Sequence, residues 1–177
     1  MMLHQDLNNY NSIRIAGVVR ESIVDGPGFR FVVFCQGCPH GCPGCHNPAT
    51  HDFAGGYDCS FEKIIDAVDA NPLLDGVTFS GGEPFCQPEA FYQLGVKLKE
   101  RNLNLMAYTG FTYEELIAME DESVNKLLSI LDLLVDGRYV QEERDLTLLF
   151  RGSKNQRVID MNLTRAENQL ILAKKYI

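Results

Sequence analysis

Four of the six cysteines lie close together in a segment rich in proline and glycine. Three of them, Cys38, Cys42 and Cys45, follow the spacing C-x3-C-x2-C. Three thiolates from one loop can hold three corners of an iron-sulfur cube, which leaves the fourth iron open to a substrate. The intervening prolines and glycines disfavour a helix and let main-chain N–H groups approach the inorganic sulfides. The spacing therefore predicts an oxygen-sensitive [4Fe-4S] cluster.

A further nearby cysteine, Cys35, leaves other kinds of metal site open. Four thiolates could saturate a zinc ion or a structural cluster, and His40, His46 or His51 could complete a mixed zinc site. The three-residue gap inside the motif disfavours one tetrahedral zinc, because zinc ribbons separate their cysteine pairs more widely. Cys35 also continues the alternation of apolar residues in 29–35, which predicts a buried strand thiol.

Composition restricts the kinds of partner. The 177 residues are 45% hydrophobic and 23% charged, as expected for one soluble domain with a real core. A formal net charge of -8 argues against nucleic acid as the main ligand. We also expect no membrane span, because no apolar run is long enough and the start lacks signal-peptide features. We therefore expect a cytoplasmic protein. Thiols in the cytoplasm are kept reduced, so the clustered cysteines favour a metal site over disulfides.

Apolar patterns predict alternating strands and helices. Strands are expected at 13–19, 29–35, 77–80, 103–108, 131–135 and 157–161. Helices are expected at 60–70, from about 88, at 112–119 and after Thr164. Thr112 with Glu115, and Thr164 with Glu167, have capping-box spacing. This alternation indicates an α/β fold with a parallel sheet in a single domain, 1–177.

The length limits how far such a sheet can close. A complete eight-stranded barrel needs about 250 residues, so this chain suits a partial, open (βα) TIM-like barrel, with its active site at the C-terminal strand ends. Its core would span about 13–160, followed by a C-terminal strand and helix extension at about 161–177. The apolar tail could cover the sheet or form a homodimer contact.

Two polar segments follow predicted strands. The first is Ser80-Gly81-Gly82-Glu83-Pro84, in which glycine-exposed main chain beside a carboxylate suits an ammonium group. The second is Asp136-Gly137-Arg138. Each could also be an ordinary turn with solvated charges.

Together, the cysteine spacing and the Gly-Gly-Glu-Pro segment resemble the radical S-adenosylmethionine superfamily. The resemblance implies that the open iron binds the methionine moiety and that one electron cleaves the sulfonium to give a 5′-deoxyadenosyl radical. It also implies the cluster cysteines as catalytic residues, and a set of cofactor contacts. These are Gly44, Asn47, Ser80, Gly81, Gly82, Glu83, Pro84, Asp136 and Arg138.

Further segments narrow the resemblance to the glycyl-radical-enzyme activases. Residues 24–30 (VDGPGFR) and 45–50 (CHNPAT) resemble that family, and 134–140 with 150–157 resemble its members that act on anaerobic ribonucleoside-triphosphate reductase. The resemblance implies that a flavodoxin or ferredoxin supplies the electron and that the reductase's large subunit supplies the glycine. Asp25 and Gly26 are candidates for the edge that meets it, although a structural turn explains them equally well.

Two alternatives stay open at this point. An activase of another glycyl radical enzyme, such as pyruvate formate-lyase, would share the cluster loop and both glycine-rich segments. A zinc-binding interaction module without catalysis would share only the cysteines. The strand end Tyr108-Thr109-Gly110 carries no acidic cation ligand of the kind related activases can have. Cys59 and Cys86 are predicted to be small buried residues.

Overall fold

One mixed seven-stranded sheet, in the order β3-β1-β2-β4-β5-β6-β7, is the frame of this computed structural model. The structure describes residues 10–177, so residues 1–9, the greater part of the start searched for a signal peptide, lie outside the described residues. The strands are β1 Ser12–Ser22, β2 Arg30–Cys35, β3 Tyr57–Ser60, β4 Gly76–Gly81, β5 Asn104–Tyr108, β6 Leu133–Asp136 and β7 Arg157–Asp160. β2, β4, β5 and β6 run parallel.

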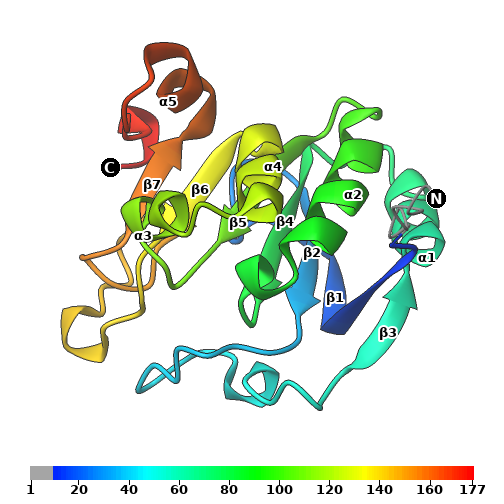
Figure 1. Cartoon of the computed structure of the whole chain (residues 1–177), viewed down its shortest axis with the longest axis horizontal. Helices are drawn as coiled ribbons and strands as arrows, with labels where there is room; N and C mark the ends of the chain where they lie inside the picture. The colour runs from blue at the N-terminus through cyan, green and yellow to red at the C-terminus, as the bar shows by residue number, and fades with distance from the viewer. Residues whose placement is uncertain (1–9) are drawn as a thin grey trace, which may run out of the picture.

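Helices connect the parallel strands, and α2 and α4 cover one face of the sheet (Figure 1). The α-helices are α1 Phe61–Asp69, α2 Pro88–Lys99, α3 Tyr113–Ala118, α4 Glu122–Ile130 and α5 Met161–Glu167. Within residues 10–177 the short 3-10 helices are η1 Pro48–Thr50, η2 Pro84–Cys86, η3 Gln141–Glu143 and η4 Lys174–Tyr176. The predicted capping box of Thr112 and Glu115 is confirmed at the start of α3.

Two apolar cores lie on opposite faces of the sheet, because successive strand residues point to opposite sides. The larger core packs the strands against the helices, and the rings of Phe79 and Phe91 meet there with centroids 4.7 Å apart. The smaller core includes Met106, Val135 and Ala173. The C-terminal tail supplies Ala173, so this part of the tail packs against the sheet, which is one of the two roles considered for it.

The structure corrects several sequence-based predictions. The sheet is α/β as expected but not wholly parallel, because β1, β3 and β7 pair antiparallel with their neighbours, and it is not closed. Strand β3 and helix α4 were not predicted. Helix α5 begins at Met161, where the Asp160 carboxylate accepts a hydrogen bond from Leu163 N. The predicted cap at Thr164 is therefore wrong, and its hydroxyl instead accepts from Ile171 N at 3.0 Å.

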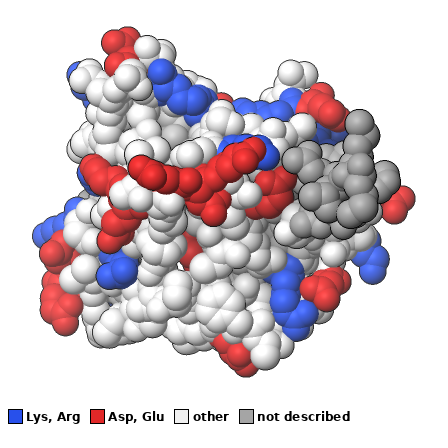
Figure 2. Space-filling view, viewed as in Figure 1, with Lys and Arg blue, Asp and Glu red and all other residues white. Residues whose placement is uncertain are grey.

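Acidic side chains cross the middle of the face shown in Figure 2. Between the start of α3 and the start of α4 the chain exposes five of them: Glu114, Glu115, Glu120, Asp121 and Glu122. Asp121 caps α4 by accepting from Ser123 N and Val124 N, which is a structural use of that charge. Such a face repels a phosphate backbone.

Arg30 at the start of β2 is a fully buried guanidinium, with 0% of its surface exposed. It donates to Thr78 Oγ1 at 2.6 Å, Val77 O at 2.9 Å and Pro27 O at 3.0 Å. Burial lowers the pKa of Arg30 to about 10, so the side chain stays charged at neutral pH. Its bond to Pro27 O attaches the glycine-rich turn at 25–28 to the sheet.

Replacing Arg30 with methionine should destabilise the protein by about 2–3 kcal/mol, because several buried acceptors lose their donor. Chemical denaturation measures the free energy of unfolding. Arg20→Met, at an exposed position on β1, is the matched control and should change it little. Equal effects of the two substitutions would contradict a structural role for Arg30.

Asp132, just before β6, makes stability depend on acid pH. It is paired with Lys99 and accepts from Leu105 N at 2.7 Å. Burial alone would raise the pKa of Asp132, but the hydrogen bonds from Lys99 and Leu105 outweigh it, and the pKa lies below its ordinary range. A lowered folded-state pKa stabilises the fold above the unfolded pKa, near pH 4, and this contribution is lost as the pH falls through the folded value.

We therefore expect the stability difference between the native chain and Asp132→Asn to shrink as the pH is lowered from 7 to about 3. Denaturant titrations at several pH values measure this difference. A difference that stays constant over that range would show that Asp132 does not carry the dependence.

Candidate active site

A loop at residues 36–47, here called the cluster loop, leaves the C-terminal end of β2 and carries the three predicted ligand cysteines. Two backbone hydrogen bonds hold its start: Gly37 N donates to Thr50 O at 2.8 Å, and Cys38 N donates to His51 O at 3.2 Å. Gly41 and Gly44 have φ values of 57° and 72°, which suit glycine. The loop's sharp changes of direction therefore depend on these glycines.

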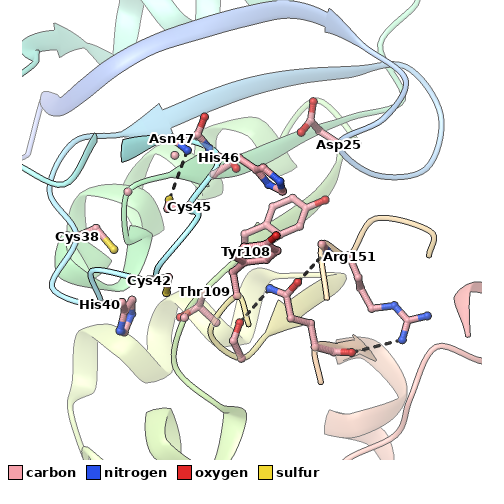
Figure 3. Close-up of a pocket in the computed structure, with 18 of the residues that line it drawn as sticks. Asp25, Cys38, His40, Cys42, Cys45, His46, Asn47, Tyr108, Thr109 and Arg151 are labelled. Carbon is pink, nitrogen blue, oxygen red and sulfur yellow. Dashed lines mark hydrogen bonds between the residues drawn. The ribbon is translucent and has the colours of Figure 1, made fainter. Parts of the chain in front are cut away.

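The cluster loop borders a cavity of about 460 Å³ at the C-terminal ends of the parallel strands. Cys38, Cys42 and Cys45 all line it, together with the ends of β4, β5 and β6. In Figure 3 the three sulfur atoms lie on one side, and Tyr108 and Arg151 lie across from them. The cavity therefore lies at the C-terminal ends of the strands, where the sequence predicts the active site.

The three cluster-loop cysteines differ from Cys35 in their surroundings. Each is partly exposed, burial raises the pKa of Cys38, and Asn47 N donates to Cys45 Sγ at 3.4 Å. Cys35 is 0% exposed, and its sulfur accepts from Gln87 Nε2 at 3.1 Å. The predicted burial of Cys35 is therefore confirmed, and this burial raises the pKa of its thiol strongly. Three partly exposed thiols facing a cavity fit a cluster with one open iron.

The glycines at the end of β4 pack directly against the end of β2 and the start of the cluster loop. Gly82 N donates to Cys35 O, and Glu83 N donates to Gly37 O, both at 2.8 Å. Gly81 has a φ of 89°, and a Cβ there would lie 2.7 Å from Cys35 N. Ser80, Gly81 and Gly82 line the cavity. Close approach of main chain to main chain therefore requires glycine at Gly81.

The carboxylate of Glu83 lies behind the cavity wall, with 0% of the residue exposed. Its Oε1 accepts from Phe85 N at 3.0 Å, and its Oε2 accepts from Gly110 N at 2.8 Å and Thr109 Oγ1 at 3.1 Å. His40 also contacts Oε2. Both carboxylate oxygens are thus bonded within the protein, and Pro84 after it is likewise buried.

Asp136 and Arg138, both predicted to contact the cofactor, differ in burial and in their hydrogen-bond partners. Asp136 is 1% exposed, is ion-paired with Arg157 and accepts from Tyr113 N at 2.7 Å. Arg138 is exposed, and its Nε donates to His40 Nδ1 at 3.2 Å. Gly137 between them lines the cavity. The structure therefore brings the main chain of this segment, rather than the Asp136 carboxylate, to the cavity.

The turn at 25–28 forms part of the mouth. Asp25 lines the cavity and accepts from Ser22 Oγ at 2.5 Å. Gly26 has a φ of 132°, and a Cβ there would lie 2.7 Å from Arg30 Cδ. Gly26 therefore allows the buried guanidinium to lie directly beneath the turn.

Sequence reasoning assigned no role to several residues on the far wall. Tyr108, Tyr139, Phe150 and Arg151 line the cavity. Arg151 donates to Tyr176 O at 3.2 Å, while its buried Nε has no hydrogen-bond partner among the described residues. The segment 150–157 was predicted to matter only from the family resemblance. It forms a loop with no helical or strand periodicity, so its sequence pattern does not indicate that its side chains line a cavity.

The remaining cysteines and histidines bear on the zinc alternative. Cys59 is buried as predicted, but Cys86 is exposed, because η2 turns it outward after the buried Phe85. The prediction of a buried Cys86 is therefore wrong. Within residues 10–177, no three His, Cys, Asp or Glu side chains are arranged to hold a single metal ion. A cubane uses one thiolate for each iron, so its ligands need not converge on one ion.

Comparisons with known proteins show the family to which the chain belongs. Residues 24–159 match the 4Fe-4S single cluster domain. The chain is 37% identical to the anaerobic ribonucleoside-triphosphate reductase-activating protein of Vibrio cholerae serotype O1, over 76% of this chain and 89% of that protein. It is 34% identical to the protein of that name from Escherichia coli strain K12, over 76% and 90%.

A likeness over a shorter stretch is to the pyruvate formate-lyase-activating enzyme of Clostridium pasteurianum, with 38% identity over 61% of this chain and 49% of that enzyme. The cysteine loop and these matches define a radical S-adenosylmethionine activating enzyme with an iron-sulfur cluster. Within that class, the chain belongs to the family of anaerobic ribonucleoside-triphosphate reductase-activating proteins. No helix in residues 10–177 is long and apolar enough to cross a membrane.

Proposed function

We propose that this chain cleaves S-adenosylmethionine at a [4Fe-4S] cluster and generates a glycyl radical on anaerobic ribonucleoside-triphosphate reductase. The carrying observation is that three partly exposed cysteines of one loop face a cavity at the ends of four parallel strands. Under this proposal the unclosed sheet is the partial, open barrel of the radical S-adenosylmethionine enzymes, with the helices outside and the cavity at its C-terminal end.

Cys38, Cys42 and Cys45 would hold the cluster. When bound, the cluster supplies the electron that splits S-adenosylmethionine into methionine and a 5′-deoxyadenosyl radical, which takes a hydrogen atom from the glycine to give 5′-deoxyadenosine. The protein's part is to orient both reactants and exclude competing ones. A flavodoxin or ferredoxin would supply the electron.

Asn47, Ser80, Gly81 and Gly82 are the proposed cofactor contacts that line the cavity itself. The main chain of Gly81 and Gly82 offers polar groups to the methionine moiety without an intervening side chain. Gly44, Glu83, Pro84, Asp136 and Arg138 complete the proposed set. Glu83 and Asp136 support it from behind the wall, since their carboxylates are bonded to protein groups.

The mouth suits a segment of a folded protein. Asp25 and Val24 line it on one side, and Leu148 and Phe150 line it on the other. Val24 is largely exposed, as are Ile23 before it and Leu146 and Leu149 on the opposite loop. Exposed apolar residues on both sides of a cavity are typical of a protein-binding surface. We propose that Asp25 and Gly26 contact the reductase at this mouth. We further propose that the reaction takes place in the cytoplasm. A homodimer of the activating protein is compatible with this arrangement.

The direct test uses anaerobically reconstituted protein with S-adenosylmethionine, reduced flavodoxin and the purified reductase. We expect a glycyl radical signal in electron paramagnetic resonance and 5′-deoxyadenosine as a product. Omitting S-adenosylmethionine should remove both. Protein that binds no iron, or cluster-loaded protein that never cleaves S-adenosylmethionine, would overturn the proposal.

Activation of pyruvate formate-lyase is the second candidate, favoured by the likeness to the clostridial enzyme. Offering both target enzymes to the same preparation separates the two. A radical on pyruvate formate-lyase alone would transfer the proposal to that substrate, with the cluster chemistry unchanged.

A further inference from the structure

His40 occupies the middle of the three-residue spacer between Cys38 and Cys42, and its side chain is only 4% exposed. Burial is unexpected for a histidine in a loop beside an open cavity. The side chain enters a socket formed by the ends of three successive parallel strands, β4, β5 and β6.

Glu83, after β4, forms the base of this socket. His40 Nε2 lies 2.7 Å from Glu83 Oε2, which also accepts from Gly110 N and Thr109 Oγ1 after β5. Three donors therefore share one fully buried carboxylate oxygen. Hydrogen bonds to a buried carboxylate are among the stronger ones in proteins.

The residues that form the walls of the socket leave space for the flat imidazole ring of His40. A Cβ at Gly110 would clash with the His40 imidazole, so that position admits the ring only as glycine. Phe111 meets the imidazole edge-on, with ring centroids 4.5 Å apart. The other ring nitrogen, Nδ1, accepts from Arg138 Nε at 3.2 Å, after β6.

These contacts engage both nitrogens of the imidazole and exclude metal binding by His40. Nδ1 accepts from Arg138 and Nε2 donates to Glu83, so both ring nitrogens are hydrogen-bonded within the protein. Neither nitrogen is available to a metal ion. His40 therefore serves as an attachment rather than a ligand.

We propose that His40 is a positioning residue: bound to Glu83, it fixes the Cys38–Cys42 spacer on the sheet and so preorganises two of the three thiols for the cluster. The inference rests on the ligand set of the proposed function. It gives Glu83 a task that requires no contact with S-adenosylmethionine, namely retention of the cluster loop.

The test measures how fast a ferrous chelator removes iron from the reconstituted protein, with neither S-adenosylmethionine nor reductase present. His40→Leu should release iron about ten- to a hundred-fold faster, as expected for loss of a buried charge-assisted hydrogen bond. His40→Gln keeps an N–H donor near the position of Nε2 and should recover part of the loss. Glu83→Gln should behave like His40→Leu, because its amide would face other donors.

His51→Gln is the matched control, since His51 also borders the cavity but its side chain has no hydrogen bond in the described structure. It should release iron at the native rate. Thermal unfolding of the iron-free proteins separates positioning from general instability, because the inference expects similar unfolding temperatures for native and His40→Gln chains. Native iron release by His40→Leu, or equal acceleration by His51→Gln, would overturn the inference while leaving the proposed radical chemistry intact.

The role of Glu83 gives an independent check. If Glu83 and His40 act as one unit, the double variant His40→Leu/Glu83→Gln should release iron no faster than either single variant. Multiplied effects would show separate roles and contradict the inference. An effect of Glu83→Gln on S-adenosylmethionine affinity alone would contradict it equally.

Discussion

Replacing Cys42 with alanine should abolish S-adenosylmethionine cleavage. Cys42 is one of three thiols that line the cavity, and the cluster loop contains no further cysteine that could replace it as a ligand. With two ligands left, a cubane cannot be held with one open corner. The expected result is loss of the brown chromophore and of 5′-deoxyadenosine formation, measured by absorbance and chromatography after anaerobic reconstitution.

Cys35→Ala is the matched control for that experiment, because it removes a thiol three residues before the motif. Its sulfur is buried and bonded to Gln87, away from the cavity. We expect a stability loss of about 1 kcal/mol and most of the cleavage activity retained. Equal loss of iron in Cys35→Ala and Cys42→Ala would show that the ligand assignment is wrong.

Gly81→Ala should have the second largest effect, on folding and cofactor binding together. The residue has a φ of 89°, and the added methyl would lie 2.7 Å from Cys35 N and Phe34 Cα. These are main-chain atoms that cannot rotate away, so the ends of β4 and β2 must separate just before the cluster loop. Strain and overpacking together should cost about 3–5 kcal/mol. Denaturation and equilibrium binding of S-adenosylmethionine measure the two consequences.

Gly17→Ala provides the control, since a Cβ at Gly17 meets nothing within 4 Å. In the strand β1 this change should be neutral or slightly stabilising. If Gly81→Ala bound the cofactor and unfolded as the native chain does, the close main-chain packing at the end of β4 would have no functional importance.

Much of the frame could be predicted from sequence because apolar periodicity reports burial directly. The runs that became β2 and β5 are mostly apolar, as is typical of parallel strands covered on both faces. Helix α3 was recognisable from its capping box. Strand β3 was missed because Tyr57–Ser60 is short and half exposed at the edge of the sheet, so it lacks an apolar pattern.

The site was predictable in its ligands and less so in its supports. Cysteine spacing identifies the thiols, since their chemistry requires proximity along one loop. The partners of Glu83 Oε2 come from residues 26 to 43 positions away, and no local pattern reports such pairing. The same holds for Arg30, whose burial depends on carbonyl groups of neighbouring strands. A charged residue inside a strand gives no sequence signal of the acceptors that surround it.

The C-terminal tail has a practical consequence for anyone preparing this protein. Tyr176 contacts the ring of Phe150, and its carbonyl accepts from Arg151, so the end of η4 touches two residues of the cavity wall. We expect that an affinity tag or fluorescent fusion joined directly after Ile177 would disturb the contacts of Tyr176 with Phe150 and Arg151, and with them the cavity wall. Labels should therefore be attached elsewhere, or separated from η4 by a long flexible spacer.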